Sequence, residues 1–155
     1  GSVDELKILD TEISLINNYL NLQCLRYNHG FHFEIKVDNE ISSDKVLFPS
    51  MFLQPFIENA VVHGVAGGGD KITVEMYKKQ NFLNIKITDN GPGYYNSANS
   101  NDRTHKSMAL KITRERIKIL KKLYNWKVEF DIKTLNEGRS EGTIVRFKLP
   151  YREIF

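Results

Sequence analysis

The sequence predicts an α+β domain, a two-layer sandwich in which helices cover one face of a mixed, mostly antiparallel sheet. Some segments place apolar residues at helical spacing, and others alternate apolar and polar residues as half-buried strands do. These segments follow the order helix, strand, helix, two strands, loop, helix, two strands. At 155 residues, 41% hydrophobic and 26% charged, the chain is expected to form a single domain, residues 1–155.

Helices are expected where apolar residues recur at intervals of three to five. The first spans 4–27 and ends at Asn28-His29-Gly30. The second spans 53–64, and the third spans about 107–124. Each has an apolar stripe that would pack against the sheet.

Strands are expected where apolar residues alternate with polar ones. The first covers 31–37, and a turn at Ser42-Ser43-Asp44 follows. After the turn Gly67-Gly68-Gly69-Asp70, the segments 72–76 and 83–87 are expected to pair as a hairpin. The last two strands are expected around 126–134 and 142–149, and the polar stretch 94–106 is expected to be a mobile loop.

Composition excludes several broad classes. A net charge of +3 allows an anionic ligand but does not form the basic stripe of a dedicated nucleic-acid binder. The single cysteine, Cys24, cannot form an internal disulfide, so a reducing compartment fits and a small core residue is the simplest role. No apolar run is long enough to span a bilayer. Gly1-Ser2 resembles a cloning remnant, so we expect the sequence to be a piece of a longer protein.

The helix at 53–64 carries an unusual polar face. At about 100° per residue, its apolar residues share one arc, whereas Glu58, Asn59 and His63 lie in the opposite arc with only Val62 among them. A surface helix needs its apolar stripe but has no structural need for a carboxylate, an amide and an imidazole together. Taken alone, this segment is equally compatible with an ordinary solvated face and with a chemical site.

A second motif follows the strand at 83–87. Asp89-Asn90-Gly91-Pro92-Gly93 ends that strand, and alternation places Asp89 on the same side as its apolar residues. A core-facing carboxylate needs hydrogen-bond donors, which the exocyclic amine of a bound base would supply. Glycines would let the backbone approach such a ligand. The alternative is a plain Asn-Gly turn, although a long polar loop follows instead of a strand.

Together these motifs resemble a known family. Glu58-Asn59-Ala60-Val61-Val62-His63-Gly64 resembles the N box, and Asp89-Asn90-Gly91-Pro92-Gly93 the DxGxG box, of the GHKL superfamily of gyrase, chaperone, histidine kinase and mismatch-repair ATPases. Leu53–Ala60 and the Asn18–Tyr27 segment are most similar to LytS-type sensor histidine kinases. The resemblance covers nearly the whole chain and implies a Bergerat-type ATP-binding fold with an ATP lid at 94–106.

The resemblance also implies roles by position. Asn59 would ligate the Mg²⁺ that bridges the ATP phosphates, which suits an amide oxygen because Mg²⁺ takes few protein ligands. Asp89, with Gly91 and Gly93, would bind the adenine end, and His63 would face the phosphates. Glu58 would be the catalytic residue that orients or deprotonates the group receiving the γ-phosphoryl.

The third box departs from the family pattern. Family members have Gly-x-Gly-Leu and a following Lys-Asn, where this chain has the segment Ser107–Ile112 with both glycines and the asparagine replaced. We expect Ser107, Ala109 and Leu110 to contact the nucleotide, with Ser107 as a helix N-cap near the phosphates. The replacements put lid closure and catalytic rate in question.

Two further positions have alternative interpretations. Arg116 lies in the apolar stripe of the third helix, where it either contacts phosphate or a carboxylate, or simply anchors internally. Thr143, in the final Gly-Thr, is expected near the nucleotide or only in strand packing. The lysines of the third helix fit a solvated face, and His29, His32 and His105 lack the context of a phosphoacceptor.

The resemblance implies the ATP-binding catalytic domain of a two-component sensor histidine kinase. It would bind ATP or ADP with Mg²⁺ and transfer the γ-phosphoryl to a histidine upstream of this fragment, so the fragment alone should not autophosphorylate. A nucleotide-binding relay module without turnover is the alternative, and an ATPase clamp is disfavoured because no transducer domain follows. The expected partners are the upstream dimerisation and phosphoacceptor region and a response regulator, with no nucleic acid and no direct membrane contact. The parent protein would be a homodimeric, membrane-anchored bacterial sensor with this domain in the cytoplasm.

Overall fold

The computed structural model describes residues 5–27, 30–93, 100–137 and 140–154, without the side chains of 100–107, 136–137 and 140–141. Its helices and strands follow the expected order, with two short strands added, at residues 6–8 and 47–49. In chain order the elements are β1 (Leu6–Ile8), α1 (Leu9–Arg26), β2 (His32–Val37), β3 (Leu47–Pro49), α2 (Gln54–Asn59), the π-helix η1 (Ala60–Val65), β4 (Lys71–Lys79), β5 (Phe82–Asp89), α3 (Ser100–Tyr124), β6 (Glu129–Glu137) and β7 (Ser140–Pro150).

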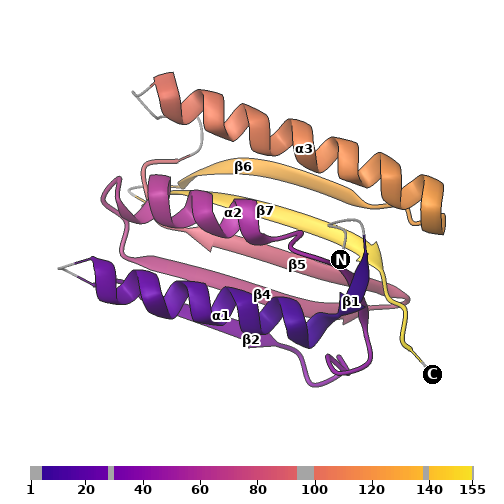
Figure 1. The fold of residues 1–155 in the computed structure, drawn as a ribbon. Coiled ribbons are helices and arrows are strands. Elements are labelled where there is room, and N and C mark those ends of the chain that lie inside the picture. The colour runs from indigo at the N-terminus through magenta and orange to yellow at the C-terminus, as the bar shows by residue number, and fades with distance from the viewer. Residues whose placement is uncertain (1–4, 28–29, 94–99, 138–139, 155) are drawn as a thin grey trace.

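The main sheet confirms the predicted α+β architecture. Its strand order is β2-β4-β5-β7-β6, in which β2 pairs parallel with β4 and the other pairs are antiparallel. Helices α1, α2 and α3 lie side by side on one face of this sheet (Figure 1). The hairpin of β4 and β5 forms where it was expected. The final pair of β6 and β7 is also present, although β6 begins and ends about three residues later than expected.

A cluster of aromatic rings joins α2 to the sheet. Phe147 of β7 is 2% exposed, and its ring centroid lies 5.1 Å from that of Phe56 and 5.4 Å from that of Phe52. Burying each such side chain contributes about 1.5–3 kcal/mol to the free energy of unfolding. The helix that carries Asn59 is therefore anchored to the sheet through its apolar side.

The start of the first helix differs from the prediction. Residues 6–8 form strand β1, which pairs antiparallel with β3, and the helix begins only at Leu9. The amides of Leu9 and Asp10 donate to the carbonyls of Val46 and Ser43, so backbone from near β3 satisfies donors that a capping side chain would otherwise serve. This pairing is non-local, and the helical spacing that includes Leu6 did not reveal it.

The third helix also begins earlier than expected. Helix α3 starts at Ser100, so the second half of the predicted loop 94–106 is helical, and residues 94–99 lie outside the described residues. The prediction that Ser107 is an N-cap is wrong, because its backbone lies inside the helix. The residues between 100 and 107 are all polar and include no glycine or proline, so they can continue a helix without producing the apolar periodicity that predicts one.

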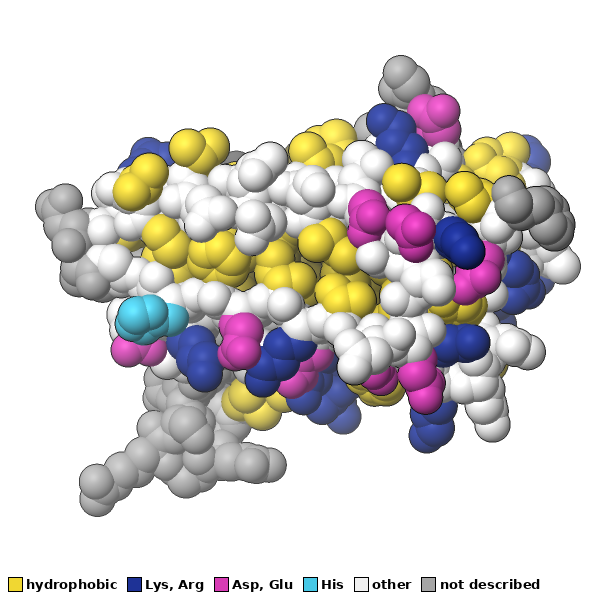
Figure 2. Space-filling view, turned by 90° about the horizontal axis from the view of Figure 1, so that it is seen from below, with side chains coloured by type: hydrophobic (Ala, Val, Ile, Leu, Met, Phe, Trp, Pro, Cys, Tyr) yellow, Lys and Arg dark blue, Asp and Glu magenta, His cyan; other side chains and the backbone are white. Residues whose placement is uncertain are grey.

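The edge strand β2 lies beside α1. An apolar strip runs along this side of the molecule, bordered by charged side chains (Figure 2). Phe33, Ile35 and Val37 of β2 are partly buried against the core, whereas the alternate residues of the strand are exposed. The alternation thus matches the half-buried strand that the sequence predicted.

Candidate functional site

The helix with the polar face changes type along its length. Helix α2 continues directly into η1, where the amide of Ala66 donates to the carbonyl of Val61, five residues earlier, at 3.0 Å. Such π-helical turns are rare and occur frequently at functional sites. The expected helix at 53–64 is therefore present as one continuous segment, with a wider turn at the end that contains His63 and Gly64.

Asp89 ends β5 on the side facing the helices. It is 8% exposed, and the amide of Gly91 donates to its Oδ1 at 2.9 Å. Across the sheet it is directly opposite Thr143 of β7. The alternation that predicted a core-facing carboxylate is confirmed.

Two glycines allow η1 to approach the end of β5. A Cβ built on Gly64 would lie 2.7 Å from Cγ of Asp89, and one built on Gly91 would lie 2.5 Å from the Cα of Gly64. Real Cβ atoms do not come this close to other heavy atoms. The missing side chain of Gly91 thus serves contact between two protein segments, whereas Gly93, at φ +95°, lines the pocket itself.

Asn90 fixes the same loop to the start of β4. Its Oδ1 accepts from the amides of Asp70 and Lys71 at 2.8 and 2.9 Å, and its Nδ2 donates to Oδ1 of Asp70 at 2.6 Å. One amide side chain therefore satisfies two backbone donors of the neighbouring strand. The loop after Asp89 is held by this residue and by its glycines together.

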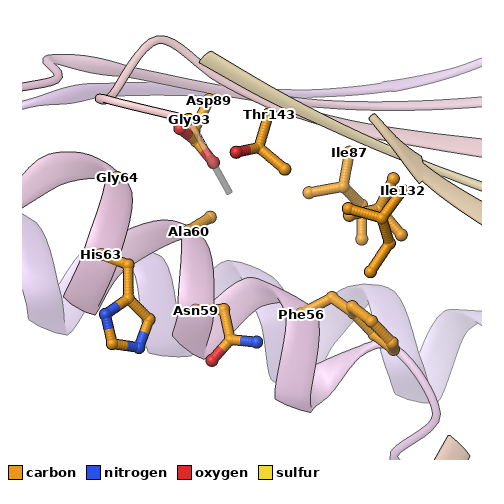
Figure 3. Close-up of a pocket in the computed structure, with 11 residues that line it drawn as sticks. Phe56, Asn59, Ala60, His63, Gly64, Ile87, Asp89, Gly93, Ile132 and Thr143 are labelled. Carbon is orange, nitrogen blue, oxygen red and sulfur yellow. The ribbon is translucent and has the colours of Figure 1, made fainter. Parts of the chain in front are cut away.

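A pocket lies between this helix and the sheet, with Asp89 and Thr143 facing Ala60 while Asn59 and His63 extend from the flank of the helix (Figure 3). The space that it encloses is about 20 Å³, enough for a water or an amine group beside Asp89. The pocket is lined by Phe56, Asn59, Ala60, His63, Gly64, Ile87, Asp89, Gly93, Ile132, Thr143 and Val145.

Glu58 separates from the other two members of the polar face. It is exposed, does not line the pocket, and accepts from Nε2 of Gln54 at 3.3 Å. Burial raises the pKa of Tyr19 on α1, and the nearby charge of Glu58 raises it further, which places Glu58 on the α1 side of the helix. The predicted trio is thus divided between the pocket, which Asn59 and His63 line, and the flank towards α1.

The remaining predicted contact residues whose side chains are described do not line this pocket. Ala109 and Leu110 are half-buried on α3, and the side chain of Ser107 is outside the described residues. Arg116 donates to the carbonyls of Ser50 and Met51, which matches the alternative of internal anchoring. Their roles towards a nucleotide stay predictions.

Several residues of the site were not singled out from the sequence. Phe56, Ile87, Ile132 and Val145 form its apolar walls, and Gly64 gives Asp89 its room. The walls carry a signal that alternation could have revealed, because Ile87 and Val145 lie two residues from Asp89 and Thr143 on their strands. No local pattern marks Gly64 as the partner of Asp89, since 25 positions separate them.

Solved structures share this architecture. The chain aligns over 97% of its length with all of the mycobacterial sensor histidine kinase MprB, at a TM-score of 0.60 and 16% identity. It aligns over the same share with 98% of the catalytic domain of histidine kinase ThkA, at a TM-score of 0.59 and 18% identity. These TM-scores show that the chain has the fold of histidine kinase catalytic domains. At identities this low, the structural similarity establishes the fold alone.

Sequence relatives narrow the assignment. The chain is 32% identical to the sensor histidine kinase/phosphatase LytS of Staphylococcus aureus (strain MRSA252) over 108 residues, 68% of this chain. It is 29% identical to the sensor protein LytS of Staphylococcus epidermidis over 95 residues, 60% of this chain. The chain is a LytS-type histidine kinase domain of the GHKL superfamily. No family model matches the sequence of this LytS-type domain.

The LytS-type domain spans only part of the proteins that it resembles. It covers 17% and 16% of the two LytS proteins, and 30% of YwpD of Bacillus subtilis, to which it is 36% identical over 86 residues. In the part of the chain that the structure describes, no helix is long and apolar enough to cross a membrane. The described residues also contain no group of three or more His, Cys, Asp or Glu side chains that could hold a metal ion.

Proposed function

We propose that this LytS-type domain binds ATP with Mg²⁺ and transfers the γ-phosphoryl to a histidine that lies outside these residues. The observation that carries the proposal is the buried carboxylate of Asp89 in a narrow pocket, with Asn59 and His63 on the adjacent helix. A hydrogen-bond donor such as an exocyclic amine is the group that a buried carboxylate favours. The domain would work in the cytoplasmic part of a two-component sensor, with a response regulator as the downstream partner.

Each end of the site would make a different contact. Asp89 would accept from the adenine amine, Thr143 lies directly across the sheet from it, and the apolar walls would pack against the base. Asn59 would offer its amide oxygen to Mg²⁺, which keeps several waters and needs few protein ligands. His63, one turn further, would face the phosphates.

Glu58 would act on the group that receives the phosphoryl. Its carboxylate is exposed on the flank towards α1, outside the pocket, where a second protein segment could reach it. In that position it would orient the acceptor imidazole or take up its proton, while Mg²⁺ would neutralise charge that develops on the phosphates. The division of the polar face into two sides supports this separation of roles.

Calorimetric titration tests the proposal. The domain should bind ADP and a non-hydrolysable ATP analogue. Asp89→Asn should weaken binding of both by about tenfold or more, because the amide loses the negative charge and replaces one of the two acceptor oxygens with a donor. Asp131→Asn is a matched control, since Asp131 is exposed on β6 and does not line the pocket. Its Oδ2 lies 3.8 Å from Nζ of Lys133, in a surface ion pair. Failure of both nucleotides to bind, or an Asp89→Asn variant that binds like wild type, would reject the adenine pocket.

One observation favours the relay module as a second candidate. The segment Ser107–Ile112, which replaces the glycine box, lies inside α3 and therefore offers no flexible loop to wrap around phosphates. A protein extended to include the upstream histidine helices distinguishes the two. Phosphohistidine formed from Mg-ATP supports the kinase, whereas nucleotide binding without phosphohistidine supports the relay.

A further inference from the structure

The helix that carries Asn59 does not provide its own N-terminal cap. No side chain of its own caps α2, and the amide of its N-cap residue, Leu53, donates instead to Oε1 of Glu12 at 3.3 Å. Glu12 comes from α1 and is 3% exposed. The carbonyl of Leu53 accepts from the amides of Phe56 and Ile57 at 3.0 and 3.1 Å, so a single residue links Glu12 to the first turn of α2. A carboxylate in this position accepts from a backbone donor that has no partner within the helix, and its negative charge is stabilised by the positive end of the helix dipole.

Arg116 of α3 binds backbone carbonyls of the residues just before α2. Its two terminal nitrogens donate to the carbonyls of Ser50, at 2.7 Å, and Met51, at 3.3 Å. The guanidinium carbon lies 5.3 Å from the ring centroid of Phe52. A planar guanidinium can make these contacts together, which an ammonium group cannot reproduce.

The turn between these two side chains has an unfavourable backbone conformation. Met51 has φ +55°, in the left-handed region, although it is not a glycine and the residue is 47% exposed. Such a residue costs free energy and persists only where surrounding contacts hold it. Arg116 contacts both neighbours of Met51 and the carbonyl of Met51 itself, and Glu12 accepts from the amide of Leu53, two residues further on.

We infer that Glu12 and Arg116 are positioning residues that clamp the turn 50–53 from two helices and so place Asn59 for Mg²⁺ and phosphate. This inference rests on the proposed function. The clamp acts on the helix, whereas Asp89 belongs to β5 and is held by its own loop contacts. Loosening the clamp should therefore affect the magnesium and phosphate end more than the adenine end. A displacement of α1 or α3 would reach the site through the same turn.

The test uses two conservative variants, Glu12→Gln and Arg116→Lys, with exposed neighbours on α3 as matched controls, Glu115→Gln and Arg114→Lys. Calorimetry compares the Mg-bound ATP analogue with ADP in the absence of magnesium. We expect each clamp variant to weaken binding of the Mg-bound ATP analogue by about tenfold, and binding of ADP without magnesium by no more than about twofold. Hydrogen exchange gives a readout that needs no nucleotide, and amides of 54–59 should exchange faster while those of β4 and β5 stay unchanged.

The outcomes separate the two proposals. Equal losses for both nucleotides, unchanged affinities, or exchange that accelerates uniformly across the sheet would each overturn the clamp, because they indicate general destabilisation or no role. If wild type binds neither nucleotide, the proposed function fails. In that case faster exchange confined to 54–59 still supports the clamp, and unchanged exchange there rejects it.

Discussion

Gly64 and Asp89 pack so closely that a Cβ built on the glycine would lie 2.7 Å from the Cγ and Oδ1 of the aspartate. The contact joins the end of the N-box helix to the end of β5, and these are the two motifs on which the functional assignment depends. A hydrogen atom at position 64 is what lets the carboxylate enter the pocket beside the helix. The distance between the helix that carries Asn59 and the carboxylate of Asp89 therefore depends on Gly64 having no side chain.

Gly64→Ala should disturb this contact. The added methyl group must displace either η1 or the Asp89 side chain, and overpacking of this kind costs about 1–3 kcal/mol. We expect a lower free energy of unfolding and weaker ADP binding, measured by urea denaturation and calorimetry. Val62→Ala, on the same helix and 50% exposed, is the control and should change neither. A Gly64→Ala variant as stable as wild type would show that the segment relaxes without cost.

Asn90→Ala should loosen the loop that follows Asp89. The substitution removes the acceptor for the amides of Asp70 and Lys71 and the donor to the Asp70 carboxylate. Hydrogen bonds of this kind contribute about 0.5–1.5 kcal/mol each, so the loss of these contacts should lower the free energy of unfolding by about 1.5 kcal/mol or more. Asn17→Ala, on the exposed side of α1, is the control. Equal stability of the two variants would contradict a structural role for Asn90.

Asn59→Ala should weaken only the magnesium-dependent part of nucleotide affinity. Its amide is the proposed ligand to Mg²⁺, and a loss of about tenfold corresponds to about 1.4 kcal/mol. Binding of ADP without magnesium should stay close to that of wild type, because Asp89 and Thr143 are untouched. Titrations with and without the metal measure this difference. An equal loss in both conditions would place Asn59 at the base or in general packing instead.

Glu12 should make stability depend on pH. Burial raises the pKa of its carboxyl above 4.5, although hydrogen bonds from Leu53, Met51 and Phe52 and the charge of Arg116 lower it in part. A raised folded-state pKa means that the native state binds the proton more tightly, so this contribution is complete below pH 4.5 and is lost as pH rises through the folded-state pKa.

The measurement is the free energy of unfolding from pH 4 upwards for wild type and Glu12→Gln. As pH rises, the free energy of unfolding of wild type should fall relative to that of Glu12→Gln, because the glutamine has no proton to lose. Glu115→Gln, at an exposed position on α3, should show no such trend relative to wild type. Parallel curves for wild type and Glu12→Gln would show that Glu12 has the same pKa folded and unfolded.

The isolated domain should form no phosphohistidine in Mg-ATP, since we place the acceptor histidine outside these residues. A phosphohistidine-specific antibody, or ³¹P spectroscopy, measures this directly. The positive control is a protein that includes the upstream helices. Phosphohistidine on this domain alone would mean that one of its own histidines is the acceptor, and the proposed division of roles would then be wrong.

Much of the fold follows from local patterns. Alternation identified β2, β4, β5 and β7, and helical spacing identified the central parts of all three α-helices, because burial of one face repeats at two residues in a strand and 3.6 in a helix. Strands β1 and β3 and the first turns of α3 were missed. The two short strands depend on pairing with each other, and the first turns of α3 consist of polar residues that leave no apolar period.

The sequence by itself determined which chemical groups the domain has and where they lie along its elements: Asn59 and His63 on a helix, and Asp89 at the end of a strand facing the core. Only the tertiary structure decided which of them meet. It separated Glu58 from the pocket, placed Thr143 opposite Asp89, and set Arg116 on the turn before α2. Local periodicity reports which side of an element is buried, whereas these contacts depend on backbone approaches between distant segments, such as that of Gly64 to Asp89, which no local pattern encodes.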